Sequence, residues 1–413
     1  MHEGFYEPLT GIVTISAKAP DDLMGENGLV PFYQNPNSSI WGRTLCRVLY
    51  HESLHFWQFL ASGYIANLLN QEWIRILHFE NTKEIKPTSE DIENYVTQQN
   101  NEPFSAFELV ECWARHWDVH TRGAASIIKE EGIEVPDGSG PLEVDRNDIV
   151  PYYTSLAYDT VMEKGPDCKQ YGRPYRWMLE NASYNSRFVA FTFPILVHHA
   201  FGSKNPVVVF RKAFERAWQS HRLQELIQKQ SRDINFAWLN IWNDIIQEAI
   251  FPTLEETHMP YYTSGFDVIE RGKLREHPIF SEYLVAAKSL RGELKLRYSN
   301  LKEPQNDQER WENALVSMPF RDVVSRLLPP SNPFPQQSMV FGLPGQPEYR
   351  LLLGQYLTPP RIKFENFSYN TRRPPLLRIK GVRPEVETYE TDTDNLVTRI
   401  QKFREAESIK NTV

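Results

Sequence analysis

The chain has few cysteines and no long uncharged apolar run, and both shortages exclude classes of protein. Its three cysteines, Cys46, Cys112 and Cys168, are an odd number without a Cys-x-x-Cys pair. We therefore expect no disulfide framework and predict a reducing, cytoplasmic location. The longest nearly uncharged apolar stretch, 188–197, contains Pro194 and is shorter than the ~18–20 residues that span a bilayer. This predicts no membrane partner.

An excess of positive charge is also missing. Lys and Arg number 45 against 53 Asp and Glu, a formal net charge of −8, which argues against nucleic acid as the main partner. Residues 1–20 lack the basic start and apolar run of a secretory signal. What the chain does have is 41% hydrophobic and 13% aromatic residues in 413, enough to bury a large core. The oligomeric state does not follow from composition.

Local patterns predict mainly helices after a short extended start. Residues 9–19 alternate and carry β-branched side chains, which is typical of a strand. A long helix is predicted over 39–62, with Gly63 at the position of a helix-terminating residue. An apolar stripe then predicts a helix over 64–80.

The clearest helix start lies at Ser105. Ser105 and Glu108 form a capping box, in which the Ser side chain and the Glu side chain each accept a backbone N–H of the other residue. Phe104 and Leu109 are spaced as the hydrophobic staple that often accompanies it. We expect this helix to run to about His120.

The residues that point to chemistry are His51-Glu52-Ser53-Leu54-His55, an H-E-x-x-H motif inside the predicted helix 39–62. Positions i and i+4 are neighbours on a helix surface, so both imidazoles can bind one Zn²⁺ ion at about 2.0–2.1 Å. Glu52 lies beside them and can take a proton from a metal-bound water. The alternative is a purely structural role, in which the helix is partly exposed and its histidines pair with carboxylates.

A catalytic zinc takes a third protein ligand, and the Ser105 helix offers two glutamates. Glu108 is occupied by the capping box, whereas Glu111 lies one turn further among apolar neighbours. A carboxylate in such surroundings requires a cation, so we predict Glu111 as the ligand. The alternative is an ordinary helix-surface ion pair with Arg115. Cys112 is a weaker candidate, better explained as a small buried hydrophobe.

These residues resemble the gluzincin branch of the HExxH zinc metallopeptidases. In several of its families the third ligand lies in an E-x-x-A-D motif, and 111–114 matches E-x-x-A, with Arg115 in place of the Asp. In those families that Asp orients a metal-bound histidine, a role open here to Asp118. The resemblance implies Zn²⁺-dependent hydrolysis of a peptide or protein substrate, with Glu52 as general base and His51, His55 and Glu111 as ligands.

The resemblance also implies a donor for the developing oxyanion, and the chain offers several without a means of choosing. They are Tyr152, Tyr153, Tyr184, Arg187, His198 and His199.

Two other functions fit parts of the pattern. Glu52-x-x-His55 and Glu255-x-x-His258 are two copies of the E-x-x-H motif of helical di-iron proteins, although Pro252 and Pro260 leave the second copy little room for a bundle helix. A mononuclear non-heme iron oxygenase could use the same HExxH residues. The third possibility is a non-catalytic interaction protein on a zincin-like scaffold, with the Pro/Gln-rich stretch 328–347 as a binding surface.

We therefore expect an α+β, mainly α fold. Residues 1–130 are predicted to form a zincin-like metal-binding core with a small N-terminal sheet. Residues 142–300 should be a helical region that closes a cleft. Residues 301–413 should be a Pro-rich, loop and extended region with a terminal helix at about 394–407.

Overall fold

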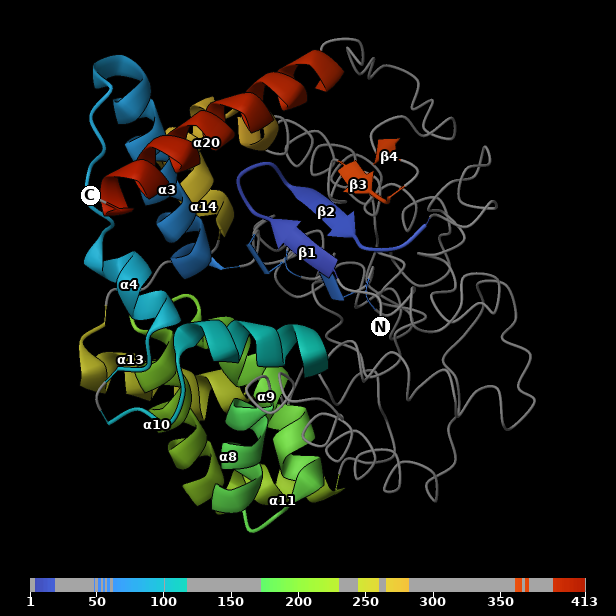
Figure 1. The fold of residues 1–413 in the computed structure, drawn as a ribbon. Coiled ribbons are helices and arrows are strands. Elements are labelled where there is room, and N and C mark those ends of the chain that lie inside the picture. The colour runs from blue at the N-terminus through green and yellow to red at the C-terminus, as the bar shows by residue number, and fades with distance from the viewer. Residues whose placement is uncertain are drawn as a thin grey trace, which may run out of the picture.

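Helices predominate in the structure, a computed structural model of the chain, and four short strands form one sheet (Figure 1). The α+β, mainly helical class is therefore confirmed. The structure describes residues 4–18, 48, 51, 52, 55, 58, 59, 62–99, 101–116, 172–229, 244–259, 265–281, 361–365, 368–370 and 389–412. In this part of the chain, no helix has the length and apolar character needed to cross a membrane. The predicted segment boundaries near 130–142 and 300 lie outside the described residues.

The sheet joins the two ends of the chain. Strand β1 (Gly4–Glu7) pairs antiparallel with β2 (Ile12–Ile15), and Gly4 faces Ile15 in the register. β2 pairs in parallel with β3 (Arg361–Lys363), which pairs antiparallel with β4 (Ser368–Asn370). The single strand predicted over 9–19 is wrong in extent, because the chain turns at Gly11, whose φ of 64° is left-handed. β1 lies at one edge of the sheet.

Helix α3 (Gly63–Thr82) begins one residue after Ser62, whose extended backbone and side chain cap it. The Ser62 hydroxyl oxygen accepts the N–H of Ile65 at 3.0 Å. The prediction that Gly63 terminates the preceding helix is therefore wrong, because Gly63 is the first residue of α3. Helix α4 (Glu90–Val96) follows and is capped by Ser89 in the same way.

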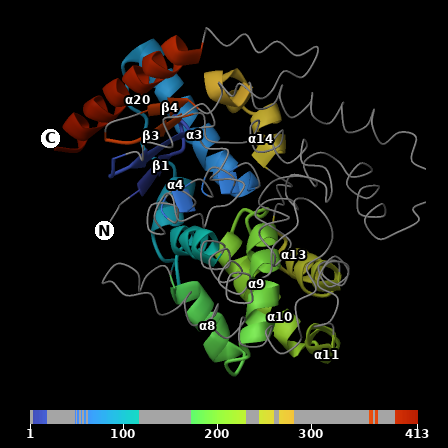
Figure 2. The same ribbon diagram turned by 90° about the vertical axis from the view of Figure 1, so that its right-hand side faces the viewer.

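The terminal helix α20 (Tyr389–Thr412) extends beyond the predicted 394–407 and lies across α3 (Figures 1 and 2). Arg399 forms a two-pronged ion pair with Glu80 of α3. The rings of Phe79 and Phe403 pack at 5.7 Å between the same helices. The C-terminal residues are therefore part of the same packed unit as the N-terminal ones.

A second group of helices surrounds α9 (Ser186–Ala200), whose residues from Phe188 to His198 are all buried. α9 contacts α8, α10, α11 and η3. These four are α8 (Arg173–Asn181), α10 (Pro206–Gln219), α11 (His221–Lys229) and the π-helical turn η3 (Ile246–Ile250). Helix α13 (Phe251–Thr257) packs against α10 and η3. α14 (Gly265–Arg271) and the 3₁₀ turn η4 (Lys273–Glu276) lie instead against α3. The helical region predicted after residue 142 thus contains the most apolar helix.

A buried histidine links η4 to α3. His277 is fully buried, its ring centroid lies 4.4 Å from that of Trp73, and its Nδ1 accepts the N–H of Ile279 at 3.2 Å. Burial, followed by the positive charge of Arg399, lowers the pKa of His277 to about 3. His277 is therefore neutral in the folded protein at pH 7.

His277 should make the folded state sensitive to acid. In the unfolded chain the pKa of this histidine is near 6.5. As the pH falls from about 6.5 toward 3, His277 is protonated in the unfolded chain but stays neutral in the folded protein, and this favours unfolding. The free energy of unfolding should drop by up to roughly 5 kcal/mol over this window. In His277→Asn, whose side-chain oxygen can still accept from Ile279, this contribution should vanish. Urea unfolding at several pH values compares the two chains, and parallel losses of stability would contradict the neutral His277.

Candidate metal centre

His51, Glu52 and His55 of the HExxH motif are helical, and both histidines face a glutamate from a distant segment. Residues 51, 52, 55, 58 and 59 are all helical. His51 Nε2 lies 3.4 Å from Glu111 Oε2, and His55 Nε2 lies 3.5 Å from Glu111 Oε1. The two imidazole rings stand edge to face with centroids 4.9 Å apart. The structure therefore brings together all three residues that the sequence predicts as metal ligands.

The spacing of these atoms fits a metal ion. One ligand atom each from His51, His55 and Glu111 can be chosen so that all lie within 4.8 Å of one another. Zinc ligands at about 2.0–2.2 Å in a tetrahedron are about 3.4 Å apart, close to the two measured His–Glu distances. A direct hydrogen bond between charged groups is shorter, about 2.7–2.9 Å. No other such group of His, Cys, Asp or Glu occurs among the described residues.

The capping box fixes where Glu111 lies. Glu108 Oε2 accepts the Ser105 N–H at 2.8 Å, and Ser105 Oγ accepts the Glu108 N–H at 3.1 Å. Glu108 Oε1 also accepts a hydrogen bond from Arg173 at 2.8 Å. The predicted capping box is confirmed, and Glu108 is occupied away from the histidines while Glu111, one turn on, faces them.

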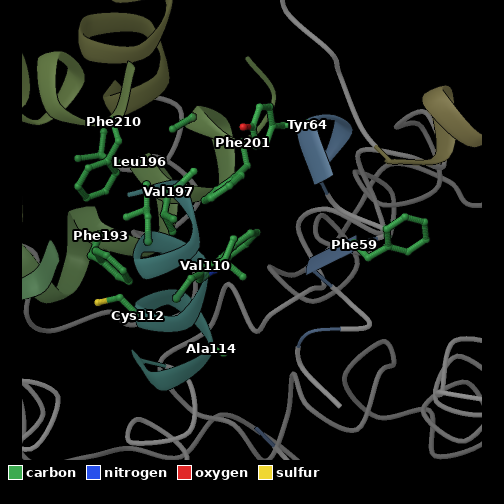
Figure 3. Packing of buried hydrophobic residues seen from close by; sticks show 14 of the residues in the cluster. Phe59, Tyr64, Val110, Cys112, Ala114, Phe193, Leu196, Val197, Phe201 and Phe210 are labelled. Atoms are coloured by element: carbon green, nitrogen blue, oxygen red, sulfur yellow. The ribbon is translucent and has the colours of Figure 1, made fainter. Parts of the chain in front are cut away.

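The helix over residues 106–116 is held by its apolar face against α9 (Figure 3). The Trp113 ring stacks on Phe201 at 5.8 Å. Val110, Cys112 and Ala114 are buried with Phe193 and other apolar side chains of α9. Burial raises the pKa of the Cys112 thiol to about 12, so this cysteine is a packing residue. The packed face directs Glu111 to the opposite side, toward the histidines.

Gln58 is a site residue that the sequence analysis missed. Its Oε1 lies 2.8 Å from His55 Nδ1, and its Nε2 donates to the Val110 carbonyl at 3.0 Å. If His55 Nδ1 carries the proton, the Nε2 lone pair points at Glu111 and is available to a metal. Gln58 makes the kind of contact with His55 that was expected of Asp118, which lies outside the described residues. Its position three residues after His55 is the signal that could have identified it.

The three residues form a charged network in the metal-free protein. Burial raises the pKa of the Glu111 carboxyl, but the charges and hydrogen bonds of His55 and His51 outweigh it and bring that pKa well below its usual range. Burial of His55 opposes protonation, yet Glu111 dominates and raises the pKa of His55 to about 9. The histidine neighbours thus keep a buried glutamate ionised, as a carboxylate ligand must be, and a metal ion that binds here would displace the proton of His55.

Glu52 lies against the edge strand of the sheet. A Cβ added at Gly4 would come within 2.6 Å of Glu52 Cγ and of Val48 Cγ1, so only glycine lets β1 approach the helix this closely. Within the described part of the chain, no residue forms a hydrogen bond or ion pair with Glu52. The half-buried carboxylate of Glu52 therefore lies between β1 and the histidines without a hydrogen bond or ion pair to any described residue.

Where they are described, the predicted oxyanion donors form no hydrogen bond or ring contact with His51 or His55. Tyr184 is 70% exposed. His198 lies on α9 against Trp113, at a ring distance of 6.0 Å, and Trp113 points roughly 200° away from Glu111 around its helix. His199 contacts the His198 ring on the same helix. Arg187 belongs to the first turn of α9, whereas Tyr152 and Tyr153 lie outside the described residues.

The second E-x-x-H motif lies elsewhere. Glu255 and His258 are exposed at the end of α13, where His258 is a left-handed cap residue. Contrary to expectation, Pro252 does not isolate this segment, because residues 244–257 are continuously helical and the π-helical turn η3 precedes the proline. A wider turn there tolerates the missing proline N–H. In the described part of the chain, the motif supplies nothing to the His51, His55 and Glu111 cluster.

No protein-family model, curated protein or solved structure matches the chain. The resemblance to gluzincin metallopeptidases thus remains an expectation carried by the residues themselves, and function must be inferred from this site.

Removing Glu111 should cost metal binding, whereas removing Glu108 should cost mainly stability. We expect Glu111→Ala to lower the metal affinity by at least about tenfold, because one of three ligands is lost. Glu108→Ala should leave the affinity nearly unchanged and lower the free energy of unfolding by roughly 1–2 kcal/mol through loss of the capping box. Titration with a competing chelator and urea unfolding measure the two effects. The opposite ranking would overturn the choice of ligand.

Gln58→Ala should weaken metal binding by roughly 10- to 100-fold without removing a ligand, because the His55 ring loses the acceptor that orients it. Gln98→Ala, an exposed glutamine outside the cluster, is the matched control. The same chelator titration measures both variants. Equal affinities for Gln58→Ala and the wild type would mean that the His55–Gln58 contact is incidental.

Proposed function

We propose that this protein is a zinc-dependent peptidase, with His51, His55 and Glu111 as the metal ligands and Glu52 as the general base. The observation that carries the proposal is the convergence of three ligand atoms from two distant helices at a spacing that suits tetrahedral coordination. The substrate is a peptide or a protein.

The chemistry follows from the roles of the residues. Zinc, when bound, supplies a Lewis acid that polarises a carbonyl group and makes a water molecule more acidic. Glu52 accepts a proton from the attacking water at a carboxylate oxygen, and the water oxygen bonds to the peptide carbonyl carbon. Glu52 then gives the proton to the departing amine as the C–N bond breaks. Gln58 holds His55 in one orientation throughout.

The position of Glu52 supports its assigned role. Its carboxylate is half-buried and uncommitted in the described structure, so it can accept a proton without first breaking an ion pair. Its charge acts on His55, which ties it electrostatically to the ligand cluster. The contact with Gly4 restricts the directions that the side chain can take.

The same donor set also suits iron. Two histidines and one carboxylate form the facial triad of non-heme Fe(II) oxygenases, which is the second candidate function. Metal analysis of the purified protein separates the two. We expect about one zinc per chain, whereas iron with a paramagnetic signature would favour the oxygenase.

Glu52→Gln should abolish peptide hydrolysis and leave the metal content near that of the wild type, because the amide cannot accept the proton while the ligands stay intact. Glu255→Gln, in the exposed second E-x-x-H motif, should keep full activity. Cleavage of a quenched-fluorescence peptide library together with metal analysis measures both properties. Full activity in Glu52→Gln would refute its role as base. A wild-type protein that binds zinc but cleaves no peptide would favour the non-catalytic interaction protein, whose predicted surface, 328–347, lies outside the described residues.

A further inference from the structure

A second candidate site lies at the start of the helix that carries Glu111. A partly open cavity of 210 Å³ lies where α4 meets the first residues of helix 106–116 and of α10. It is about 9 Å along the helix axis from Glu111, the length of six residues. The pockets of drug-sized ligands measure about 300–1,000 Å³, so this cavity suits a small group.

Negative charge predominates in the lining. Glu90, Asp91 and Glu102 supply three carboxylates, and Lys204 supplies one ammonium group. Arg211, which is not part of the lining, pairs with Glu102 at 3.1 Å. Asp91 accepts one hydrogen bond from Gln71 at 2.8 Å, which fixes that carboxylate and leaves its charge without a cation among the described residues.

The hydroxyl group of Tyr64 lines the cavity without a hydrogen-bond partner among the described residues. Tyr64 lines it and is only 5% exposed. Across the described residues, its hydroxyl has no hydrogen-bond partner. The hydroxyl oxygen is not among the fully buried polar atoms although the side chain is, so the hydroxyl faces the cavity that Tyr64 lines and can bind a ligand there.

The backbone N–H groups at the helix starts around the cavity are capped, which disfavours an anion as the ligand. Helix starts attract anions through free N–H groups, but here these groups are capped. Ser105 accepts the Glu108 N–H at 3.1 Å, and Asn205 accepts the Val208 N–H at 3.3 Å. The first turn of α4 already carries acidic residues that offset its helix dipole.

A chelated metal ion fits no better. Glu90, Asp91 and Glu102 do not form a group of ligand atoms close enough to share one ion, a property found in the described part of the chain only for His51, His55 and Glu111. Carboxylates spread around a small cavity suit an organic cation, which has several donors at its rim and an apolar stem.

We propose that this cavity binds a guanidinium or ammonium group, with Asp91 as the principal anionic partner and the Tyr64 hydroxyl as an additional hydrogen-bonding group. The group could belong to a free small amine or to a basic side chain of a peptide. Binding does not depend on turnover, so the proposal stands or falls separately from the peptidase.

Calorimetric titration of the full chain tests the proposal. The probes are butylguanidine, N-acetyl-argininamide and its neutral isostere N-acetyl-citrullinamide. We expect the citrulline compound to bind at least about tenfold more weakly than the arginine compound, because hydrogen bonds to charged groups are the stronger ones. Binding of butylguanidine alone would assign the site to free amines, and stronger binding of the arginine compound would assign it to peptide side chains.

Two variants locate the binding. Asp91→Asn should weaken the arginine compound by about tenfold and Tyr64→Phe by about fivefold, whereas Glu93→Gln, on the exposed side of α4, should change nothing. The proposal is overturned if the isostere binds equally well, if both variants bind like the wild type, or if no cation binds at millimolar concentration. Binding of inorganic phosphate or Mg²⁺ in preference to the cations would equally overturn it.

Discussion

The structure of the candidate site depends on one buried negative charge, the carboxylate of Glu111. Its side chain is only 14% exposed, and burying an ionised carboxylate is costly unless a cation and hydrogen bonds compensate it. His51 and His55 supply the compensation because their spacing of four residues puts both rings on one face of a helix. The helix over residues 106–116 must in turn stay in one register, or Glu111 would leave its partners. The Trp113–Phe201 stack and the buried apolar face hold that register along the helix, whereas the Ser105–Glu108 capping box determines where the helix begins.

The sequence was sufficient to single out His51, His55 and Glu111 because the information about them is local. The H-E-x-x-H spacing determines which side chains share a face, and the capping box decides between Glu108 and Glu111 by occupying the first. Gln58 was not predicted, because part of the information about it is not local. Its contact with His55 is local, but its orientation depends on the Val110 carbonyl, which only tertiary packing brings within 3.0 Å. The spacing of three residues from His55 could have suggested the contact, but it does not show that the Val110 carbonyl holds the amide in place.

Most of the sheet could not be predicted from local sequence patterns. Strands of three or four residues have no periodicity to detect, and β2 pairs with β3 from the far end of the chain. The turn at Gly11 shortens the strand that alternation predicts over 9–19 to Ile12–Ile15, and the pattern gives no sign of β1 before it. Ser62 and Gly63 show a similar ambiguity, because a Ser–Gly pair can end one helix or begin the next. Here the pair begins α3, because the Ser62 hydroxyl oxygen accepts the N–H of Ile65 in the first turn of that helix. The same hydroxyl donates to the Phe201 carbonyl at 3.1 Å, which holds the Ser62 side chain in this position.

Helix 106–116 also connects the candidate metal centre to the acidic cavity, and the connection is mechanical. The segment before the helix is anchored by the ion pair of Glu102 with Arg211, and its first turn by that of Glu108 with Arg173. Glu102 lines the cavity, whereas Glu108 holds the helix start. A change in charge at the cavity therefore acts on the same helix that positions Glu111, one and a half turns further along. Packing against α9 resists sliding of this helix, so the candidate metal centre and the cavity are held at a fixed separation by one packed element.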